Sequence, residues 1–181
     1  MKKLILVLVV VAMLIGVGGN AFAVNLPGVA PEGSNPKNAV HADLSWLFSG
    51  LISGGFGIGA GYERAVLPYL SIKATGGFIF WPYGSSISIL GGVRGYFLKG
   101  AVNGPFAGVS AGVNIASFSY GGYGASGVGF SMLIEGGYKF TVMNGGQGGF
   151  FVEPVIGALL GFGAGGVGAG FHWGANIGWS F

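Results

Sequence analysis

The sequence predicts an all-β fold, an eight-stranded antiparallel up-and-down β-barrel of the transmembrane kind. Three observations lead to this prediction. Charged residues make up 7% of the chain, against about 25% in ordinary soluble domains, and Gly supplies 41 of the 181 residues. The mean hydropathy is +0.71, yet no long uncharged apolar stretch follows residue 23. Eight segments alternate apolar with polar or small residues in period two, which is the pattern of barrel strands.

The first 23 residues have the features of a secretory signal peptide. Lys2 and Lys3 precede the apolar run 4–17, and the small-residue pattern Ala21-Phe22-Ala23 follows it. The run is shorter than the roughly 20 residues of a spanning helix. We therefore expect residues 1–23 to be a cleaved signal peptide, residues 24–39 a periplasmic lead-in, and residues 40–181 an outer-membrane barrel.

The composition also excludes several function classes. The chain has no Cys, so it has no disulfide and no thiolate nucleophile or metal ligand. Without Lys2 and Lys3 the formal net charge falls from +3 to +1, and a charge this small does not indicate nucleic-acid binding.

The first predicted strand is 40–48. One of its residues, Trp46, also belongs to the aromatic girdle that the sequence predicts. Its outward face would carry Val40, Ala42, Leu44, Trp46 and Phe48, opposite His41, Asp43 and Ser45. Aromatic residues near segment ends are typical of the girdles of membrane barrels. The predicted girdle consists of Trp46, Trp81, Tyr83, Trp173 and Trp179.

The next six predicted strands follow the same alternation, as in 86–97, where Ile87 and Ile89 oppose Ser86, Ser88 and Arg94. Each is about the length of a tilted membrane strand. Their ranges are 56–64, 69–81, 86–97, 106–117, 128–142 and 150–160.

The last predicted strand, 170–181, has the clearest alternation. Its outward positions include Trp173, Ile177, Trp179 and the terminal Phe181, with Gly, His, Asn and Ser between them. Compact turns rich in Gly or Pro are predicted at 64–68, 99–104 and 143–148, and short outward connections at 49–55, 82–85, 118–127 and 161–168.

Three rival architectures fit less well. Small-xxx-small spacings within 157–170 are typical of packed membrane helices, but Gly at this density weakens helices. A soluble sandwich would not be so poor in charge, and a low-complexity chain would not contain eight segments in phase.

On these residues the chain resembles the small eight-stranded outer-membrane barrels, the group of the outer membrane protein A membrane domain, OmpX and OmpW. The resemblance is carried by the final strand, by Gly-Gly-Tyr-Lys-Phe at 136–140 and by Phe-Phe-Val-Glu-Pro at 150–154. It implies a monomer without cofactors, whose partners are outer-membrane lipids and the barrel-assembly machinery. It also implies an assembly signal formed by Trp173, Ile177, Trp179 and Phe181.

The candidate functional residues are the polar side chains on the lumen face. An eight-stranded barrel is just wide enough for side chains to fill, and buried charges must be paired, so a salt-bridge network is expected. The predicted network consists of Asp43, Glu63, Lys73, Arg94, Glu135, Lys139, Glu153, His41 and His172.

Two binding or transport hypotheses stand beside this structural one. Inward glycines could leave a porin-like polar path for a small solute, with Arg94 and the Glu residues at its constriction. The same void could hold an apolar ligand, as the resemblance to OmpW implies, against Leu90, Leu133, Phe151 and Leu159.

The sequence gives even less support to an enzymatic function or to a metal site. Lipid deacylases of the PagL group carry a motif resembling His-x-Ser, but His172 is followed by Trp173 and Gly174, which leaves only a pairing with Ser110 or Ser131. His41, His172 and Asp43 could bind zinc only if they met at one height in the barrel. We therefore predict no catalytic residue and no metal.

Overall fold

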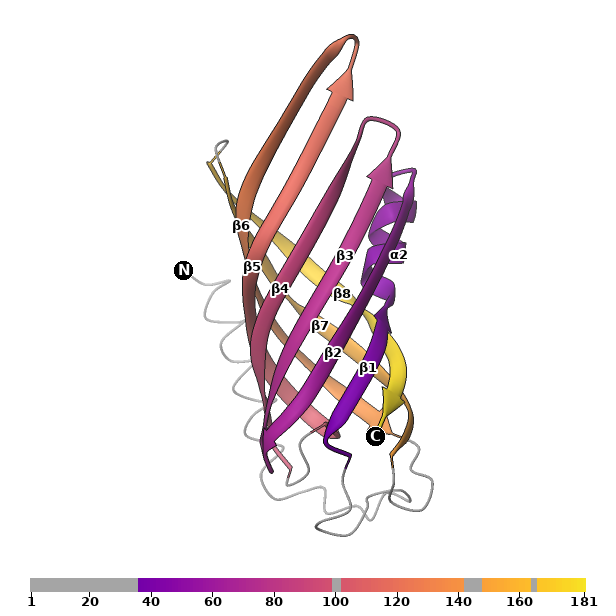
Figure 1. Cartoon of the computed structure of the whole chain (residues 1–181), viewed down its shortest axis with the longest axis vertical. Helices are drawn as coiled ribbons and strands as arrows, with labels where there is room; N and C mark the ends of the chain where they lie inside the picture. The colour runs from indigo at the N-terminus through magenta and orange to yellow at the C-terminus, as the bar shows by residue number, and fades with distance from the viewer. Residues whose placement is uncertain (1–35, 99–101, 142–147, 164–165) are drawn as a thin grey trace, which may run out of the picture.

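The protein folds as a closed barrel of eight antiparallel strands (Figure 1). The computed structural model describes residues 36–98, 102–141, 148–163 and 166–181. The predicted signal peptide and most of the lead-in lie outside these residues. The strands are β1 (Asn38–Asp43), β2 (Phe56–Leu67), β3 (Leu70–Trp81), β4 (Gly84–Tyr96), β5 (Gly104–Tyr120), β6 (Tyr123–Thr141), β7 (Gly149–Gly163) and β8 (Gly166–Ser180). The predicted all-β fold, a closed antiparallel up-and-down barrel of eight strands, is confirmed.

The barrel has two unlike ends. At one end, which we call the terminal end, the backbones of Asn38 and Phe181 form two hydrogen bonds of 2.8 Å, next to the turn between β2 and β3. We call the opposite end the far end. The far end carries the turns between β3 and β4 and between β5 and β6 (Figure 1).

The alternation of side chains is the one that the sequence predicts. On β4, Ile87 and Ile89 are 47% and 61% exposed on the outer face, whereas Ser88 and Leu90 between and beside them are buried. Period-two geometry sends successive side chains to opposite faces of a strand. The apolar surface of this protein is therefore on the outside of the barrel.

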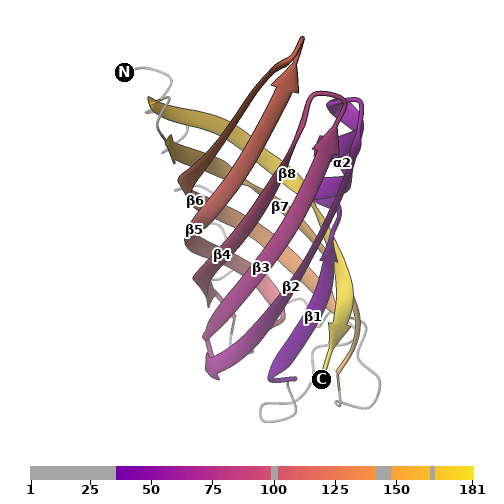
Figure 2. The same cartoon turned by 45° about the horizontal axis from the view of Figure 1, so that its top comes forward.

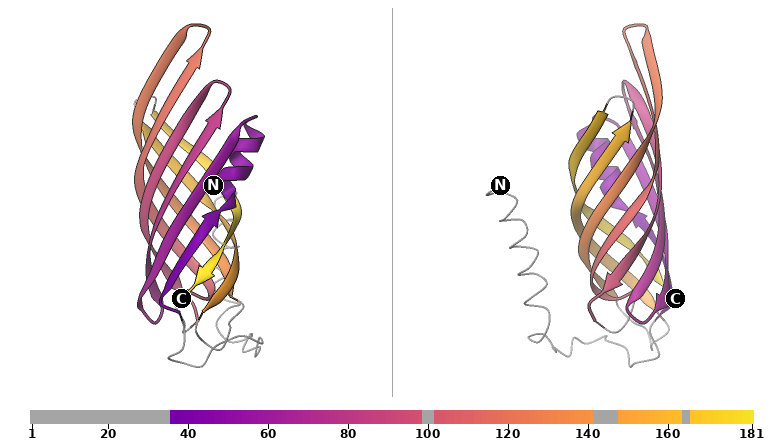
Figure 3. Two further views of the ribbon diagram at one scale, coloured as in Figure 1. Left: turned by 45° about the vertical axis from the view of Figure 1, so that its right-hand side comes forward. Right: turned by 90° about the vertical axis from the view of Figure 1, so that its left-hand side faces the viewer.

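The strands at the far end are longer than predicted. Gly121 and Gly122 form a two-residue turn with φ of 61° and 85°, the positive values that such hairpin turns require. Most of the predicted connections 118–127 and 161–168 is therefore strand, and the β5–β6 hairpin projects beyond the rest of the barrel (Figure 3). Both faces of this hairpin are exposed at its tip, so alternation gave no strand signal there.

The first predicted strand is wrong beyond Asp43, because Leu44–Ile52 forms helix α2. The Asp43 side chain accepts a hydrogen bond from the Ser45 backbone N–H at 3.0 Å, which is an N-cap. Ser53 donates back to the Ser49 carbonyl at 2.8 Å, and Gly54 follows with a φ of 73°, the left-handed conformation that ends helices. The local capping interactions therefore favour a helix over the strand that the alternation predicts.

Helix α2 becomes part of the barrel wall. β1 pairs with β2 only as far as Ala42 and with β8 only as far as Asp43. Beyond these residues α2 lies between β2 and β8 (Figure 2). Within the described ranges, no helix is long and apolar enough to cross a membrane.

Trp46 faces the lumen and is not a girdle residue, which corrects the prediction. Its indole lies against two glycines that are aligned on neighbouring strands. A Cβ added at Gly59 would lie 2.2 Å from this ring, and one at Gly77 would lie 2.1 Å from it. Because they have no side chains, the two glycines leave the space for the Trp46 ring that α2 places against β2 and β3.

We predict that Gly77→Ala destabilises the barrel by about 1–3 kcal/mol, because the new methyl group overlaps the Trp46 ring. The matched control is Gly170→Ala on β8, where an added Cβ meets nothing within 4 Å. The measurement is the free energy of unfolding in urea, in detergent micelles. Equal values for the two variants would contradict this packing.

Candidate functional site

Six of the predicted charged residues meet in one layer across the barrel interior. All are on the inward face of their strands, and each is at most 6% exposed. They come from five strands: Glu63 from β2, Lys73 from β3, Arg94 from β4, Glu135 and Lys139 from β6, and Glu153 from β7. We call these six side chains the ionic layer.

Arg94 is the centre of the ionic layer. Its Nη1 lies 3.2 Å from a Glu63 oxygen, its Nε 2.9 Å from a Glu135 oxygen and its Nη2 2.8 Å from a Glu153 oxygen. The planar guanidinium group offers several donors in fixed directions, so one side chain joins three strands to its own.

The two lysines complete the pairing. Lys139 forms ion pairs with Glu63 and with Glu153, the latter at 3.1 Å, and Lys73 pairs with Glu135. Three acidic groups therefore face three basic groups, and the layer is neutral. Buried charges without such partners would be very costly.

Neutral hydrogen-bond donors satisfy further carboxylate oxygens. The Tyr96 hydroxyl donates to Glu63 at 2.7 Å, as does the Ser71 hydroxyl. The Asn176 amide donates to Glu153 at 2.7 Å.

An apolar floor closes the lumen on the terminal side of the ionic layer. The Arg94 guanidinium lies 4.2 Å from the centre of the Phe106 ring, and the Lys139 ammonium lies 4.6 Å from that of Phe151. Such contacts of cations with ring faces are attractive. The floor consists of Ala39, Tyr96, Val102, Phe106, Phe151 and Val155, all buried.

Sequence reasoning did not single out Phe106, Val155 or Val102 for this floor. Phe106 and Val155 have the same parity as the inward Gly108 and Glu153, so parity was a usable signal. Val102 lies in the turn before β5 with a φ of 78°, a strained value for a β-branched residue, and nothing in the sequence indicates this.

The other three members of the predicted network do not join the ionic layer. Asp43 caps α2. His41 is buried edge-on against Phe151, with ring centroids 6.4 Å apart, and neither ring nitrogen has a hydrogen-bond partner. His172 lies on the far side of the layer, in the wall of a cavity.

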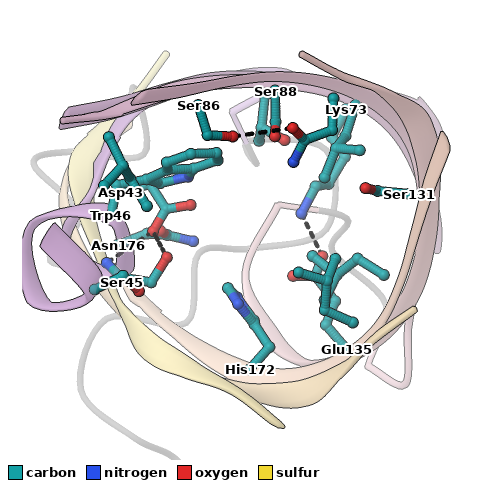
Figure 4. Close-up of a pocket in the computed structure, with 17 residues that line it drawn as sticks. Asp43, Ser45, Trp46, Lys73, Ser86, Ser88, Ser131, Glu135, His172 and Asn176 are labelled. Atoms are coloured by element: carbon teal, nitrogen blue, oxygen red, sulfur yellow. Dashed lines mark hydrogen bonds and ion pairs between the residues drawn. The ribbon is translucent and has the colours of Figure 1, made fainter. Parts of the chain in front are cut away.

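This cavity of about 160 Å³ occupies the lumen between the ionic layer and the far end (Figure 4). Asp43, Ser45 and Trp46 lie on its α2 side, and the Lys73–Glu135 pair lies opposite (Figure 4). In the remaining wall, neutral polar residues outnumber apolar ones. The polar residues are Ser49, Thr75, Ser86, Ser88, Asn114, Ser131, His172 and Asn176, beside the apolar Ile79, Leu90, Leu133 and Leu159.

Among the described residues, one fully buried polar atom of the cavity wall has no hydrogen-bond partner. Asn176 is 3% exposed, and its Oδ1 accepts no hydrogen bond, while its amide is committed to Glu153. An acceptor of this kind is satisfied by a hydroxyl or N–H group that enters the cavity.

The predicted assembly residues end the barrel as expected for a last strand. Trp173, Trp179 and Phe181 are about half exposed on the outer face, and Trp179 is aligned with Val40 of β1 and Phe150 of β7. Recognition of these residues and of Ile177 by an assembly machinery stays a prediction.

The geometry does not favour the metal or enzyme hypotheses. In the part of the chain that the structure describes, no three His, Asp or Glu side chains gather as a metal site would require. Ser110 Oγ has no hydrogen-bond partner, and Ser131 and His172 lie on different walls of the cavity (Figure 4).

Fold and interior together define a small closed barrel with a filled terminal end and a polar cavity above it. Comparisons with family models, with curated proteins and with solved structures found no match.

We predict that Arg94→Ala lowers the free energy of unfolding by about 3–5 kcal/mol, since it leaves three buried carboxylates with only two cations. The control is Arg64→Ala at the exposed end of β2, for which we expect a change within about 0.5 kcal/mol. Urea unfolding in detergent micelles measures both. A small loss for Arg94→Ala would mean that the ionic layer contributes little.

Proposed function

We propose that this protein is an outer-membrane β-barrel that does not conduct solutes and that binds a small molecule in its far-end cavity. The observation that carries this proposal is the neutral ionic layer, which fills the lumen between the cavity and the apolar floor. Because the ionic layer blocks the lumen below the cavity, molecules can enter and leave the cavity only from above this layer.

The outer surface supports the membrane part of the proposal. Ile58, Ile89 and Ile134 are 60%, 61% and 50% exposed on the strand faces that would contact lipid. Among the described residues, Lys37 and Arg64 are the only exposed charges, and they lie side by side at the terminal end. A soluble protein of this size has many more exposed charges.

The location and the partners follow from the same reasoning. A signal peptide at 1–23 would export the chain, and the terminal strand with Phe181 suits the barrel-assembly machinery. The terminal end would then face the periplasm and the cavity the exterior. Lipids would be the permanent partners of the monomer, and we propose neither a cofactor nor a catalytic role.

A purely apolar ligand is the second candidate. Leu90, Leu133 and Leu159 do line the cavity, as the sequence hypothesis requires, but Phe151 lies below the ionic layer in the floor. The mixed lining favours a ligand with polar groups of its own.

We predict that Ile89→Arg destabilises the barrel in phosphatidylcholine vesicles by about 2–4 kcal/mol, because the charge would face lipid near the midplane. The control is Tyr123→Arg at the tip of the β5–β6 hairpin, where the residue is 84% exposed and lies beyond the proposed bilayer. Urea unfolding of the vesicle-bound protein compares the two. Equal stabilities would argue against insertion.

We predict that the refolded protein gives no discrete conductance in planar bilayers. The double variant Arg94→Ser/Glu153→Ser removes one charge of each sign and leaves the Lys73–Glu135 and Lys139–Glu63 pairs, so it opens space without leaving the layer charged. We expect brief openings from this variant. Regular openings of the unaltered protein would overturn the non-conducting proposal.

A further inference from the structure

The barrel wall has a gap beside the cavity. The pairing of β1 ends at Ala42–Ala60 on one side and at Asp43–Asn176 on the other. In the described residues, β8 from Gly166 to Ala175 and β2 from Phe56 to Gly59 therefore have no strand partner on the sides that face each other. A barrel normally removes such edges by closing completely.

Helix α2 covers this gap, and its N-terminal end is held beside β8 by Asp43, the last residue of β1, which is aligned with Asn176. It continues into β2 through the turn 53–55, where the Gly55 N–H donates to the Gly50 carbonyl at 2.8 Å. The backbone approach to β2 is so close that a Cβ at Gly57 would lie 1.9 Å from the Trp46 carbonyl oxygen.

Helix α2 contacts β8 at two places above Asp43. Ser45 packs closely on Gly174, where an added Cβ would lie 2.6 Å from the Ser45 Cβ, and further along the helix the Phe48 ring stacks on Trp173 with centroids 5.7 Å apart. Within the part of the chain that is described, no hydrogen bond joins α2 to β8. The part of the helix beyond Ser45 can therefore move away from β8 without breaking a hydrogen bond to β8, while its N-terminal end stays next to the paired Asp43 and Asn176.

The inward faces of β7 and β8 are unobstructed near this side of the helix. On the inward faces of β7 and β8, Cβ atoms added at Gly161, Gly168 and Gly170 would meet nothing within 4 Å. Just below them lies the cavity, with Ser45, His172 and Asn176 in its wall. A molecule that passed between α2 and β8 would reach this space directly.

The cavity wall indicates the class of molecule. Of its three charged groups, Lys73 and Glu135 are paired with each other and Asp43 accepts hydrogen bonds from the Ser45 N–H and hydroxyl, so none of them requires a charged ligand. The free acceptor on Asn176 and the serine hydroxyls suit an uncharged headgroup with hydroxyl donors. A space of about 160 Å³ holds a group of roughly the size of benzene or glycerol.

We propose that α2 closes a lateral opening between β2 and β8, through which a single-chain amphiphile places a small uncharged hydroxyl headgroup in the cavity while its chain stays in the bilayer. This inference rests on the proposed membrane location and on the cavity as a binding site. It adds the route and the class of ligand.

The experiment uses the Cys-free background of the chain and the fluorescence of Trp46. Phe48→Cys and Trp173→Cys replace the stacked pair between α2 and β8, and Trp81→Phe and Trp179→Phe leave Trp46 as the sole Trp. A short bis-methanethiosulfonate reagent cross-links the two thiols reversibly, and mass spectrometry verifies the link. The probe is a monoacylglycerol brominated next to its ester, added to the protein in phosphatidylcholine vesicles.

The matched control cross-links β4 to β5 at the same end of the barrel. Ser85 and Ser117 are aligned partners whose hydroxyl oxygens lie 3.0 Å apart, so Ser85→Cys/Ser117→Cys joins strands that are already paired. In this control Trp81, Trp173 and Trp179 are all replaced by Phe.

We expect saturable quenching of Trp46 in the reduced protein and in both states of the control, removed by excess unbrominated monoacylglycerol. Cross-linking α2 to β8 should weaken the apparent affinity about tenfold or more, because it lowers the population of the open state. Equal quenching with and without the α2–β8 link would overturn the lateral route while leaving the cavity as a binding site. Absence of saturable quenching in every form would overturn this ligand class and the cavity-binding part of the proposed function. The proposed membrane location and the non-conducting lumen are tested separately, by the insertion and conductance experiments.

Discussion

The arrangement of the barrel depends above all on Arg94 and the three carboxylates around it. These groups come from different strands, so each strand must place its charged residue inward and at the same height. A shift of one residue in any of these strands would turn its charge to the apolar outer face. The ionic layer therefore fixes both the register of β2, β4, β6 and β7 and the side of the sheet that faces the lumen. Its neutrality, three acids against three bases, is what permits a layer of charges to lie between an apolar floor and a cavity that opens toward the far end.

The far end of the barrel obeys a different constraint. Only glycine can lie under the Trp46 ring at positions 59 and 77, because any Cβ there would overlap the indole. These two glycines let α2 lie against β2 and β3 with its aromatic side chain inside and Leu51 and Ile52 outside. The wall thus has one helix where a strand would have paired two strand edges, and among the described residues no hydrogen bond joins that helix to the edge of β8. In a bilayer, unpaired backbone groups are costly, so such a gap is tolerated where it lines a cavity.

The sequence was sufficient for the architecture because the outer face is so uniformly apolar. Ile87 against Ser88, or Ile134 against Glu135, fixes the direction of a side chain with little ambiguity, and the same parity identified all six members of the ionic layer. It failed where a different force decided the local structure. Leu44, Trp46 and Phe48 continue the alternation of β1, but Leu47 breaks it, and the Asp43 cap with Gly54 at the other end favours a helix. Asp43 was likewise assigned to the network, since parity cannot distinguish a lumen charge from a helix cap. The cavity and the gap were beyond the sequence, because they depend on how far β1 extends relative to its two neighbours.

The combination of a filled terminal end with an incomplete wall at the far end separates binding from transport. A molecule in the cavity meets Lys73 and Glu135 below it, and moving further would separate buried ion pairs, which is costly. It must therefore leave on the side from which it came, either through the far end or past α2. The two exits differ in chemistry: one leads to water, and the other passes between Phe48 and Trp173, which are apolar. An amphiphile can use the second exit without bringing its chain into the polar cavity, whereas a free polar solute gains nothing from it. On the proposed lateral route, the position of the helix, held by backbone packing on β2 and by Ser45 and the Phe48 ring on β8, decides which molecules can occupy the cavity.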